Sequence, residues 1–492
     1  KEAILDALAL KDVRRSEEKG FCLRGLVCAS IESGLLGHSL FKLERRSDLP
    51  DKALPPHKFS PHDIVVIRPN KSDPKSKDQE SSLEGVIYRV RDTSITVACD
   101  TQTDDDFLGE QSSVRLEKLF NETTHNRLKR TLDRLSKVAG GSDDSDSAQL
   151  VRMAFAGDGA DAPRFSARLP KPLQFFSSQL DDSQRDAISH ALRAEDIAII
   201  HGPPGTGKTT TVVELILQEV ARGSRVLVAA ASNVAVDNLV ERLTSFGGPT
   251  KPKAKPRGTR ADQGKGGRAA PRLKVVRIGH PARLLPQVLD TCLDSLVLNS
   301  DGSQLARDCR NEMRDVNRQL CKLKRHERAT RRQLRKELRA LSKEERMRHE
   351  KAIREVVSGA NVVACTLTGC MMFQVDKERF DVVIVDEAAQ AHECATWAAL
   401  LKGKRAVLAG DHHQLPPTVI SDTAQRKGLG TTLFERLHRM HAKEGGSSVA
   451  KMLTVQYRMN EQIMRWSSDE FYAGRLVAGK AVAGHVLADL QA

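Results

Sequence analysis

The feature that most constrains this chain is a nine-residue loop, Gly-Pro-Pro-Gly-Thr-Gly-Lys-Thr-Thr, at residues 202–210. An apolar run at 197–200 precedes the loop, and a segment of helical composition and spacing, 211–220, follows it. The sequence therefore predicts a strand, a tight glycine turn and a helix. In such a turn the backbone N–H groups and the positive end of the helix dipole are directed at phosphate oxygens. The loop thus predicts a site for the phosphates of a nucleotide.

The residue types in this loop have distinct expected roles. Lys208 is expected to meet the β- and γ-phosphates, and the Thr209 hydroxyl is expected to ligate Mg²⁺. The loop residues predicted to bind ATP are Gly202, Pro203, Pro204, Gly205, Thr206, Gly207, Lys208, Thr209 and Thr210. A glycine-rich loop without a ligand is the alternative, and the flanking strand and helix argue against it.

Residues 173–447 predict an α/β domain around a parallel sheet. Short apolar runs alternate there with helical stretches, as expected of strands that are buried on both faces. The predicted strands are 197–200, 225–231, 274–278, 361–366, 381–386 and 405–411.

Two insertions interrupt this domain. The segment 248–272 is rich in Pro, Gly, Lys and Arg, and we expect it to be disordered. Contact with phosphates and a merely solvated loop both remain open for it. The charged segment 301–357 carries two apolar stripes, which predict two packed helices, with a partner-binding role as the alternative.

The first part of the chain predicts a separate β domain. Residues 1–19 are charged and have helical spacing. Between 20 and 118 we expect a small barrel or sheet, because short β-like runs alternate with turn-rich segments. Those runs are 21–30, 63–68, 83–91 and 94–99. A helix at 119–138 and a linker rich in Gly, Ser and Asp make 119–172 a predicted stalk.

Two carboxylates lie at the end of the predicted strand 381–386, one on its last residue and one on the residue that follows. Asp386 and Glu387 therefore lie at the edge where open α/β sheets bind ligands. Asp386 is expected to hold Mg²⁺ through water. Glu387 is expected to accept a proton from the water that attacks the γ-phosphate.

A glutamine motif follows the predicted strand 405–411. The neutral side chain of Gln414 is expected to hydrogen-bond the γ-phosphate or the attacking water, and so to distinguish ATP from ADP. The adjacent His412 and His413 are interpreted as loop residues, because no Cys or carboxylate spacing around them indicates a metal site.

Composition narrows the classes of partner. The 492 residues carry a net charge of +14, which favours a polyanionic partner, nucleic acid first. The nine cysteines lack zinc-knuckle spacing, so we expect reduced thiols and no disulfides. We find no apolar run long enough to span a bilayer and expect no membrane partner. The first residue is Lys1, so we expect the N-terminus to be incomplete.

Together the motifs resemble superfamily 1 helicases of the nonsense-mediated-decay branch, and most of all their immunoglobulin mu-binding-protein type. The segments that carry the resemblance are GPPGTGKTT (202–210), SNVAVDNL (232–239), VVRIGHPARLL (275–285), VDEAAQ (385–390), GDHHQLPP (410–417), VQYRMN (455–460) and IMRWSSDEFYAGRL (463–476). The resemblance runs from about residue 20 to 492. It implies a RecA-like P-loop NTPase domain, an N-terminal β-barrel accessory domain, a helical stalk and the beginning of a second RecA-like domain at 448–492.

The resemblance also implies roles for single residues. Gln184 would read the adenine, with a polar residue on a helix surface as the alternative. Tyr457 would stack on the base, and Arg458 would reach the γ-phosphate from the second motor domain. The residues expected to grip the sugar-phosphate backbone of one strand are Ser232, Asn233 and Thr366, with strand-end caps as the alternative.

The implied function is ATP-dependent 5′→3′ translocation on single-stranded DNA or RNA, with ATP and Mg²⁺ as cofactors. We expect a monomer in the nucleus and cytoplasm, with ribonucleoprotein partners left open. An ATP-gated nucleic-acid clamp with little unwinding is the alternative. A P-loop kinase fits poorly, because Gln414 and Arg458 would have no role in it. The chain stops soon after Tyr472, so we expect a fragment that lacks part of its active site.

Overall fold

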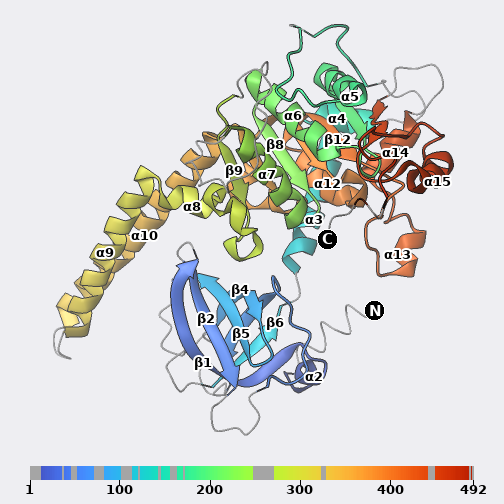
Figure 1. The fold of residues 1–492 in the computed structure, drawn as a ribbon. Helices are drawn as coiled ribbons and strands as arrows, with labels where there is room; N and C mark the ends of the chain where they lie inside the picture. The colour runs from blue at the N-terminus through green and yellow to red at the C-terminus, as the bar shows by residue number, and fades with distance from the viewer. Residues whose placement is uncertain are drawn as a thin grey trace. The chain divides into compact units, whose positions relative to one another are not determined.

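The computed structural model describes residues 13–35, 38–45, 53–70, 82–100, 113–119, 122–141, 146–155, 163–169, 172–247, 271–322, 328–441, 449–486 and 489. The chain divides into two compact units (Figure 1). One comprises Lys1–His125 with His280–Leu284, and the other comprises Asn126–Gly279 with Leu285–Ala492. Across the described helices, none is both long enough and apolar enough to cross a bilayer.

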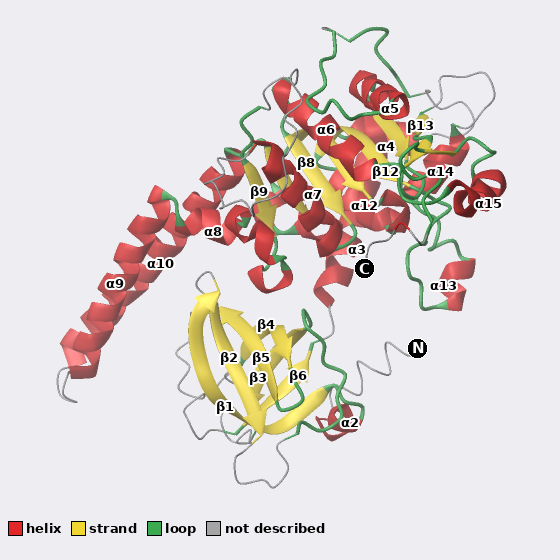
Figure 2. Cartoon of the chain, viewed as in Figure 1, coloured by secondary structure: helices red, strands yellow, loops and turns green. Residues whose placement is uncertain are grey.

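The first unit is a closed antiparallel barrel with the strand order β1-β2-β5-β4-β3-β6 (Figure 2). Its strands are β1 (Cys22–Leu35), β2 (His38–Arg45), β3 (Ile64–Pro69), β4 (Leu83–Val90), β5 (Ser94–Asp100) and β6 (Val114–Lys118), and a short helix, α2 (Val13–Glu18), precedes them. Closure leaves no unpaired strand edge. The barrel expected from 20–118 is therefore confirmed, and residues 1–12 of the predicted helix lie outside the described residues.

Two barrel strands, β2 and β6, were not predicted. Each alternates apolar and charged residues over a short stretch, a pattern that a solvated loop also shows. In the barrel, Val114 and Leu116 of β6 are fully buried in the core beside Leu43 and Ile87. The detached segment His280–Leu284 belongs to this unit because Ala282 packs against Val86.

The second unit is built on a seven-stranded parallel sheet with the order β13-β7-β12-β11-β8-β10-β9. The strands are β7 (Ile197–His201), β8 (Val226–Ala230), β9 (Val275–Ile278), β10 (Val362–Thr366), β11 (Phe380–Asp386), β12 (Gly403–Gly410) and β13 (Ala450–Met452). Every residue of β7, β8 and β9 is buried, which explains their predominantly apolar sequences. The first six strands confirm the predicted RecA-like sheet.

Helices cover the sheet and extend from it. They are α3 (Glu122–Ala139), α4 (Ala148–Phe155), α5 (Asp182–Arg193), α6 (Lys208–Ala221), α7 (Asn233–Gly247), α8 (Leu293–Leu298), α9 (Asp301–Lys322), α10 (Arg328–Ser358), α11 (Phe373–Asp376), α12 (Glu393–Leu400), α13 (Asp422–Arg426), α14 (Leu433–Met440) and α15 (Glu461–Phe471). The two helices expected in the charged insertion are α9 and α10, which lie side by side (Figure 1). Of the basic insertion 248–272, residues 248–270 lie outside the described residues.

The seventh strand, β13, was not predicted. It pairs in parallel with β7, so the chain is still part of the first sheet beyond residue 447, where the sequence places the start of the second domain. The next strand, β14 (Val455–Gln456), pairs with β15 (Val477–Ala478) in a separate small sheet.

The register brings the predicted motifs to one edge of the large sheet. His201, the last residue before the phosphate loop, lies opposite Gly410 at the end of β12. Asp386 and Thr366, at the ends of β11 and β10, both lie opposite Ala230 at the end of β8. Because the strands are parallel, their carboxyl ends form a single rim, and ligands of open α/β sheets bind at such rims.

Candidate nucleotide-binding and hydrolysis site

The phosphate loop turns through two glycines in the left-handed region. Gly205 has φ +77° and Gly207 has φ +75°, a conformation that L side chains rarely adopt. A Cβ at Gly205 would lie 2.7 Å from Cβ of Arg458, and one at Gly207 would lie 2.5 Å from Nε2 of Gln184. The loop therefore needs glycine both for its turn and for the close approach of two other predicted ATP-site residues.

Helix α6 begins at Lys208 with its first turn open. Its N-cap residue is Gly207, and no side chain of the described residues caps it. The first N–H groups of a helix have no partner within the helix, so an anion placed there is stabilised by those groups and by the helix dipole. This is the local chemistry that a phosphate requires.

The predicted lysine and the predicted base form an ion pair. Nζ of Lys208 lies 2.7 Å from Oε2 of Glu387. Glu387 has φ +51°, a left-handed conformation that is strained for a residue other than glycine and is enriched at functional sites. The backbone N–H of Glu387 donates to Oδ1 of Asp386 at 3.0 Å. The structure thus brings these three residues together at the end of β11.

Asp386 carries a buried carboxyl group, whose ionised form a neighbouring cation would stabilise. Burial raises its pKa to about 6; Lys208 opposes this shift and Glu387 adds to it. The Thr209 hydroxyl, one residue into α6, is the second oxygen donor predicted for the metal. Hard oxygen donors of this kind are the ligands that Mg²⁺ takes in nucleotide sites, so the residues present fit that ion.

Gln184 lies against the phosphate loop. Its Nε2 donates to the carbonyl oxygen of Thr206 at 2.9 Å, and its Oε1 accepts from the N–H of Asp181. Asp181 and Gln184 form a reciprocal capping box at the start of α5. The sequence Asp-Asp-Ser-Gln carries the signal for this cap, although Asp181 was not singled out from it. The adenine-reading role of Gln184 stays a prediction.

Tyr457 and Arg458 reach the same loop from beyond β13. The backbone N–H of Tyr457 donates to the carbonyl of Gly205 at 2.8 Å, and its hydroxyl donates to Asp181 at 2.9 Å. Burial, together with the Asp181 carboxylate, raises the pKa of Tyr457 to about 12. The N–H of Arg458 donates to Oε1 of Gln456 at 2.8 Å. The stacking role of Tyr457 and the γ-phosphate role of Arg458 stay predictions.

Gln414 is oriented by a buried aspartate that the sequence did not single out. Its Nε2 donates to Oδ2 of Asp411 at 2.7 Å, and the hydroxyl of Tyr472 donates to the same oxygen at 2.8 Å. Oδ1 of Asp411 is 2.9 Å from Nε2 of His201. Asp411 therefore connects the end of β7, the glutamine motif and the segment after α15.

The three predicted strand-gripping residues lie on the rim, but two of them make local contacts. Oγ of Ser232 accepts from the N–H of Ala235, and Oγ1 of Thr366 accepts from the N–H of Gly369. These contacts are the strand-end caps of the alternative interpretation.

Asn233 makes a different contact. Its Oδ1 accepts from the fully buried Arg277, which also pairs with Asp237 at 2.7 Å. The nucleic-acid roles of Ser232, Asn233 and Thr366 therefore stay predictions. Arg277 was missed because a charged residue within an apolar strand gives no sign of its partner.

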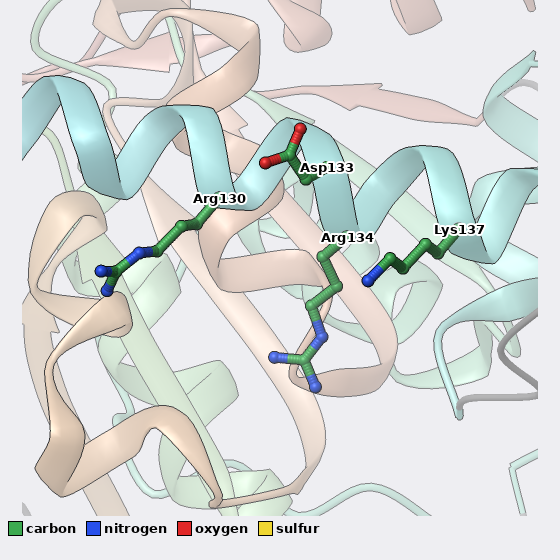
Figure 3. A pocket seen from close by; sticks show the side chains of 4 residues that line it. All are labelled: Arg130, Asp133, Arg134 and Lys137. Atoms are coloured by element: carbon green, nitrogen blue, oxygen red, sulfur yellow. The ribbon is translucent and has the colours of Figure 1, made fainter.

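A basic cavity lies elsewhere in this unit, along α3. It has a volume of about 410 Å³ and is lined by Arg130, Asp133, Arg134 and Lys137. Figure 3 shows the three cations extending to one side of the helix and Asp133 to the other. None of the phosphate-loop residues lines it. Cations on one helix face can contact phosphates, and Arg134 is in addition 3.6 Å from Asp376.

Three protein-family descriptions match the chain. An AAA domain matches residues 179–422, the helicase SMUBP-2/HCS1 1B domain matches residues 4–119, and a further AAA domain matches residues 429–491. The 1B-domain match covers the barrel. The two AAA matches cover the parallel sheet and the segment that contains Tyr457 and Arg458.

Curated relatives match over almost the whole chain. It is 39% identical over 484 residues to the DNA-binding protein SMUBP-2 of Mus musculus, and the matched region covers 97% of this chain and 44% of that protein. It is 34% identical to the DNA polymerase alpha-associated DNA helicase A of Schizosaccharomyces pombe (96% of this chain, 66% of that protein). It is 30% identical to the protein of the same name in Saccharomyces cerevisiae (98% and 70%). The chain thus spans less than half the length of the SMUBP-2 relative.

Proposed function

The chain belongs to the SMUBP-2/HCS1 family of superfamily 1 helicases, and from this premise we propose that it is an ATP-dependent helicase that translocates on single-stranded nucleic acid. The observation that carries the proposal is the convergence on one sheet rim of the phosphate loop, the Asp386–Glu387 pair and Gln414, with Tyr457 and Arg458 held against that loop.

In phosphoryl transfer, some of these residues would neutralise charge and others would position the reacting groups. Catalysis of this reaction depends mainly on positioning and on stabilisation of negative charge. Lys208 would neutralise the terminal phosphates. Lys208 pairs with Glu387 in the structure. Phosphates that bind the Lys208 ammonium would therefore break this ion pair, and the Glu387 carboxylate would then be available as the base. Asp411 fixes the amide of Gln414, which would sense the γ-phosphate.

Thr209 and Asp386 would hold Mg²⁺. When bound, this ion supplies positive charge to the phosphate oxygens. The ionised form of Asp386 is disfavoured by burial, so a cation beside it also offsets that cost.

Coupling to movement would begin at the contacts of Tyr457. Its N–H bonds the phosphate loop itself, through Gly205, so a nucleotide that reshapes the loop acts on the segment that carries Arg458. We propose single-stranded DNA or RNA as the track, with 5′→3′ direction. The net charge of +14 and the DNA-binding and DNA-helicase names of the relatives support this substrate class.

The test is ATP hydrolysis by the full-length protein with single-stranded RNA, with single-stranded DNA and with neither, followed by strand displacement on duplexes with a 5′ or a 3′ overhang. We expect a single strand to stimulate hydrolysis and the 5′ overhang to be unwound. If ATP and a single strand bind without stimulated turnover, the protein is a clamp and the helicase proposal is refuted.

A Lys208→Ala variant checks that the loop is the site of turnover. It removes the cation that would meet the terminal phosphates, so both ATP binding and hydrolysis should be lost. Lys427→Ala is the control, because Lys427 is an exposed lysine that follows α13. Near-normal hydrolysis in the Lys208 variant would show that the chemistry occurs elsewhere.

A further inference from the structure

Four histidines gather beside the phosphate loop. His201 ends β7, His412 and His413 follow β12, and His438 lies on α14. The ring centroid of His412 is 5.1 Å from that of His201, 4.0 Å from that of His413 and 4.8 Å from that of His438. The sequence interpretation of His412 and His413 as loop residues missed this cluster, because its other members come from distant parts of the chain.

A carboxylate completes the donor set. Oδ1 of Asp411 lies 2.9 Å from Nε2 of His201. One ligand atom from each of His201, Asp411 and His412 lies within 4.8 Å of the other two. Nδ1 of His412 is buried and has no hydrogen-bond partner among the described residues. Buried polar atoms in proteins are normally satisfied, so this nitrogen indicates a missing partner.

Burial and charged neighbours perturb the pKa values of the groups in this cluster. Burial lowers the pKa of His412 and of His438 to about 4, and the neighbouring histidines add to both shifts. Burial opposes ionisation of Asp411, but hydrogen bonds from His201, Gln414 and Tyr472 outweigh it and hold its pKa well below the usual value. The charged and titratable groups that act on the cluster are His201, Asp411, His413, Glu435, His438, Tyr472 and Arg475.

We propose that His201, Asp411 and His412 bind a divalent transition-metal ion, for which Zn²⁺ is the best fit. Two imidazoles and a carboxylate are a donor set for zinc, whereas Mg²⁺ favours oxygen ligands. Zinc bonds of roughly 2.0–2.2 Å place tetrahedral ligand atoms about 3.3 Å apart, so these atoms, which lie within 4.8 Å of one another, would have to draw closer when the ion binds.

The site differs from the predicted Mg²⁺ site in both ligands and chemistry. Zn²⁺ would replace the hydrogen bond between Nε2 of His201 and Oδ1 of Asp411, with the imidazole proton carried on Nδ1, while Oδ2 keeps its hydrogen bonds from Gln414 and Tyr472. The ion would tie the end of β7 to the loop after β12, two segments that are distant in sequence. Binding requires neither nucleotide nor nucleic acid, so this inference and the proposed helicase function can fail independently.

Equilibrium dialysis of the untagged, metal-free protein against Zn²⁺ in excess Mg²⁺ tests the proposal. We expect one equivalent of zinc to be retained by the wild type and by Asp386→Asn, which alters the predicted Mg²⁺ site. His412→Gln should lose that equivalent. His485→Gln, which changes an exposed histidine, should keep it.

A spectroscopic measurement on the wild type avoids dependence on the fold of a variant. Co²⁺ in a tetrahedral nitrogen and oxygen site should give an intense visible absorption that Zn²⁺ abolishes, and Zn²⁺ should raise the midpoint of thermal unfolding. Weak octahedral absorption, zinc retained in full by His412→Gln, or zinc lost with Asp386→Asn would each overturn the assignment.

Discussion

From the ion pair between Lys208 and Glu387 we predict two opposite effects of Glu387→Gln, on ATP affinity and on the rate of hydrolysis. The pair joins Nζ and Oε2 at 2.7 Å, and the two side chains are only 10% and 30% exposed. Phosphates that bind Lys208 must displace Glu387 from the ammonium. Glutamine keeps the shape of the side chain but not its charge, so the competition for Lys208 should weaken.

The expected magnitudes follow from the position of the pair. A partly exposed ion pair is worth about 1 kcal/mol, so its loss should tighten ATP binding by about five-fold. Loss of a positioned general base should lower hydrolysis by about two to four orders of magnitude. A variant that binds better and turns over far less is thus expected.

The assay combines ATP affinity by calorimetry with single-turnover hydrolysis. Glu435→Gln is the matched control, because it removes the same charge from a similarly exposed glutamate, which pairs with the exposed Arg439 on α14. It should change neither quantity. If Glu387→Gln binds ATP more weakly than the wild type, the carboxylate supports the loop rather than competing for its lysine, and the reasoning is wrong.

Two further predictions concern the loop and the histidine cluster. Gly205→Ala should weaken ATP binding, because it adds a collision with Arg458 to the strain of a left-handed φ; Gly223→Ala carries similar strain (φ +87°) with no atom within 4 Å of its Cβ, and should leave ATP affinity unchanged. An equal loss in both variants would contradict the collision. For His412 and His438 in the metal-free protein, the folded pKa of about 4 lies below the unfolded value of about 6.5, so the unfolded chain binds more protons in this window. Their stabilising effect should be full above pH 6.5 and lost as the pH falls towards 4, and the unfolding midpoint of the double Gln variant should vary less with pH; parallel pH profiles for the two proteins would argue against the shifts.

Local patterns in the sequence were sufficient for much of this site. The strand before Gly202 and the helix from Lys208 follow from apolar runs and glycine spacing, which depend on neighbouring residues. Asp386 and Glu387 could be placed on the same rim as the loop, because the carboxyl ends of parallel strands share an edge.

What the sequence missed depends on contacts between distant segments. Asp411 acquires its role only when β7, β12 and the region of Tyr472 meet, and no spacing in the chain encodes that meeting. Strand β13 is three residues long, and it forms because β7 offers an unpaired edge. The roles of Ser232 and Thr366 towards nucleic acid stay predictions, because in the structure their oxygens accept backbone N–H groups of their own turns.

The short connection after β13 has a mechanical consequence. Only Leu453 and Thr454 separate β13, in the large sheet, from β14, in the small one. Leu453 is itself tied by its N–H to the carbonyl of His201 at 2.8 Å. A connection this short and this well anchored has almost no slack. A displacement of His201, the residue directly before the phosphate loop, would therefore reach the small sheet through very few intervening residues.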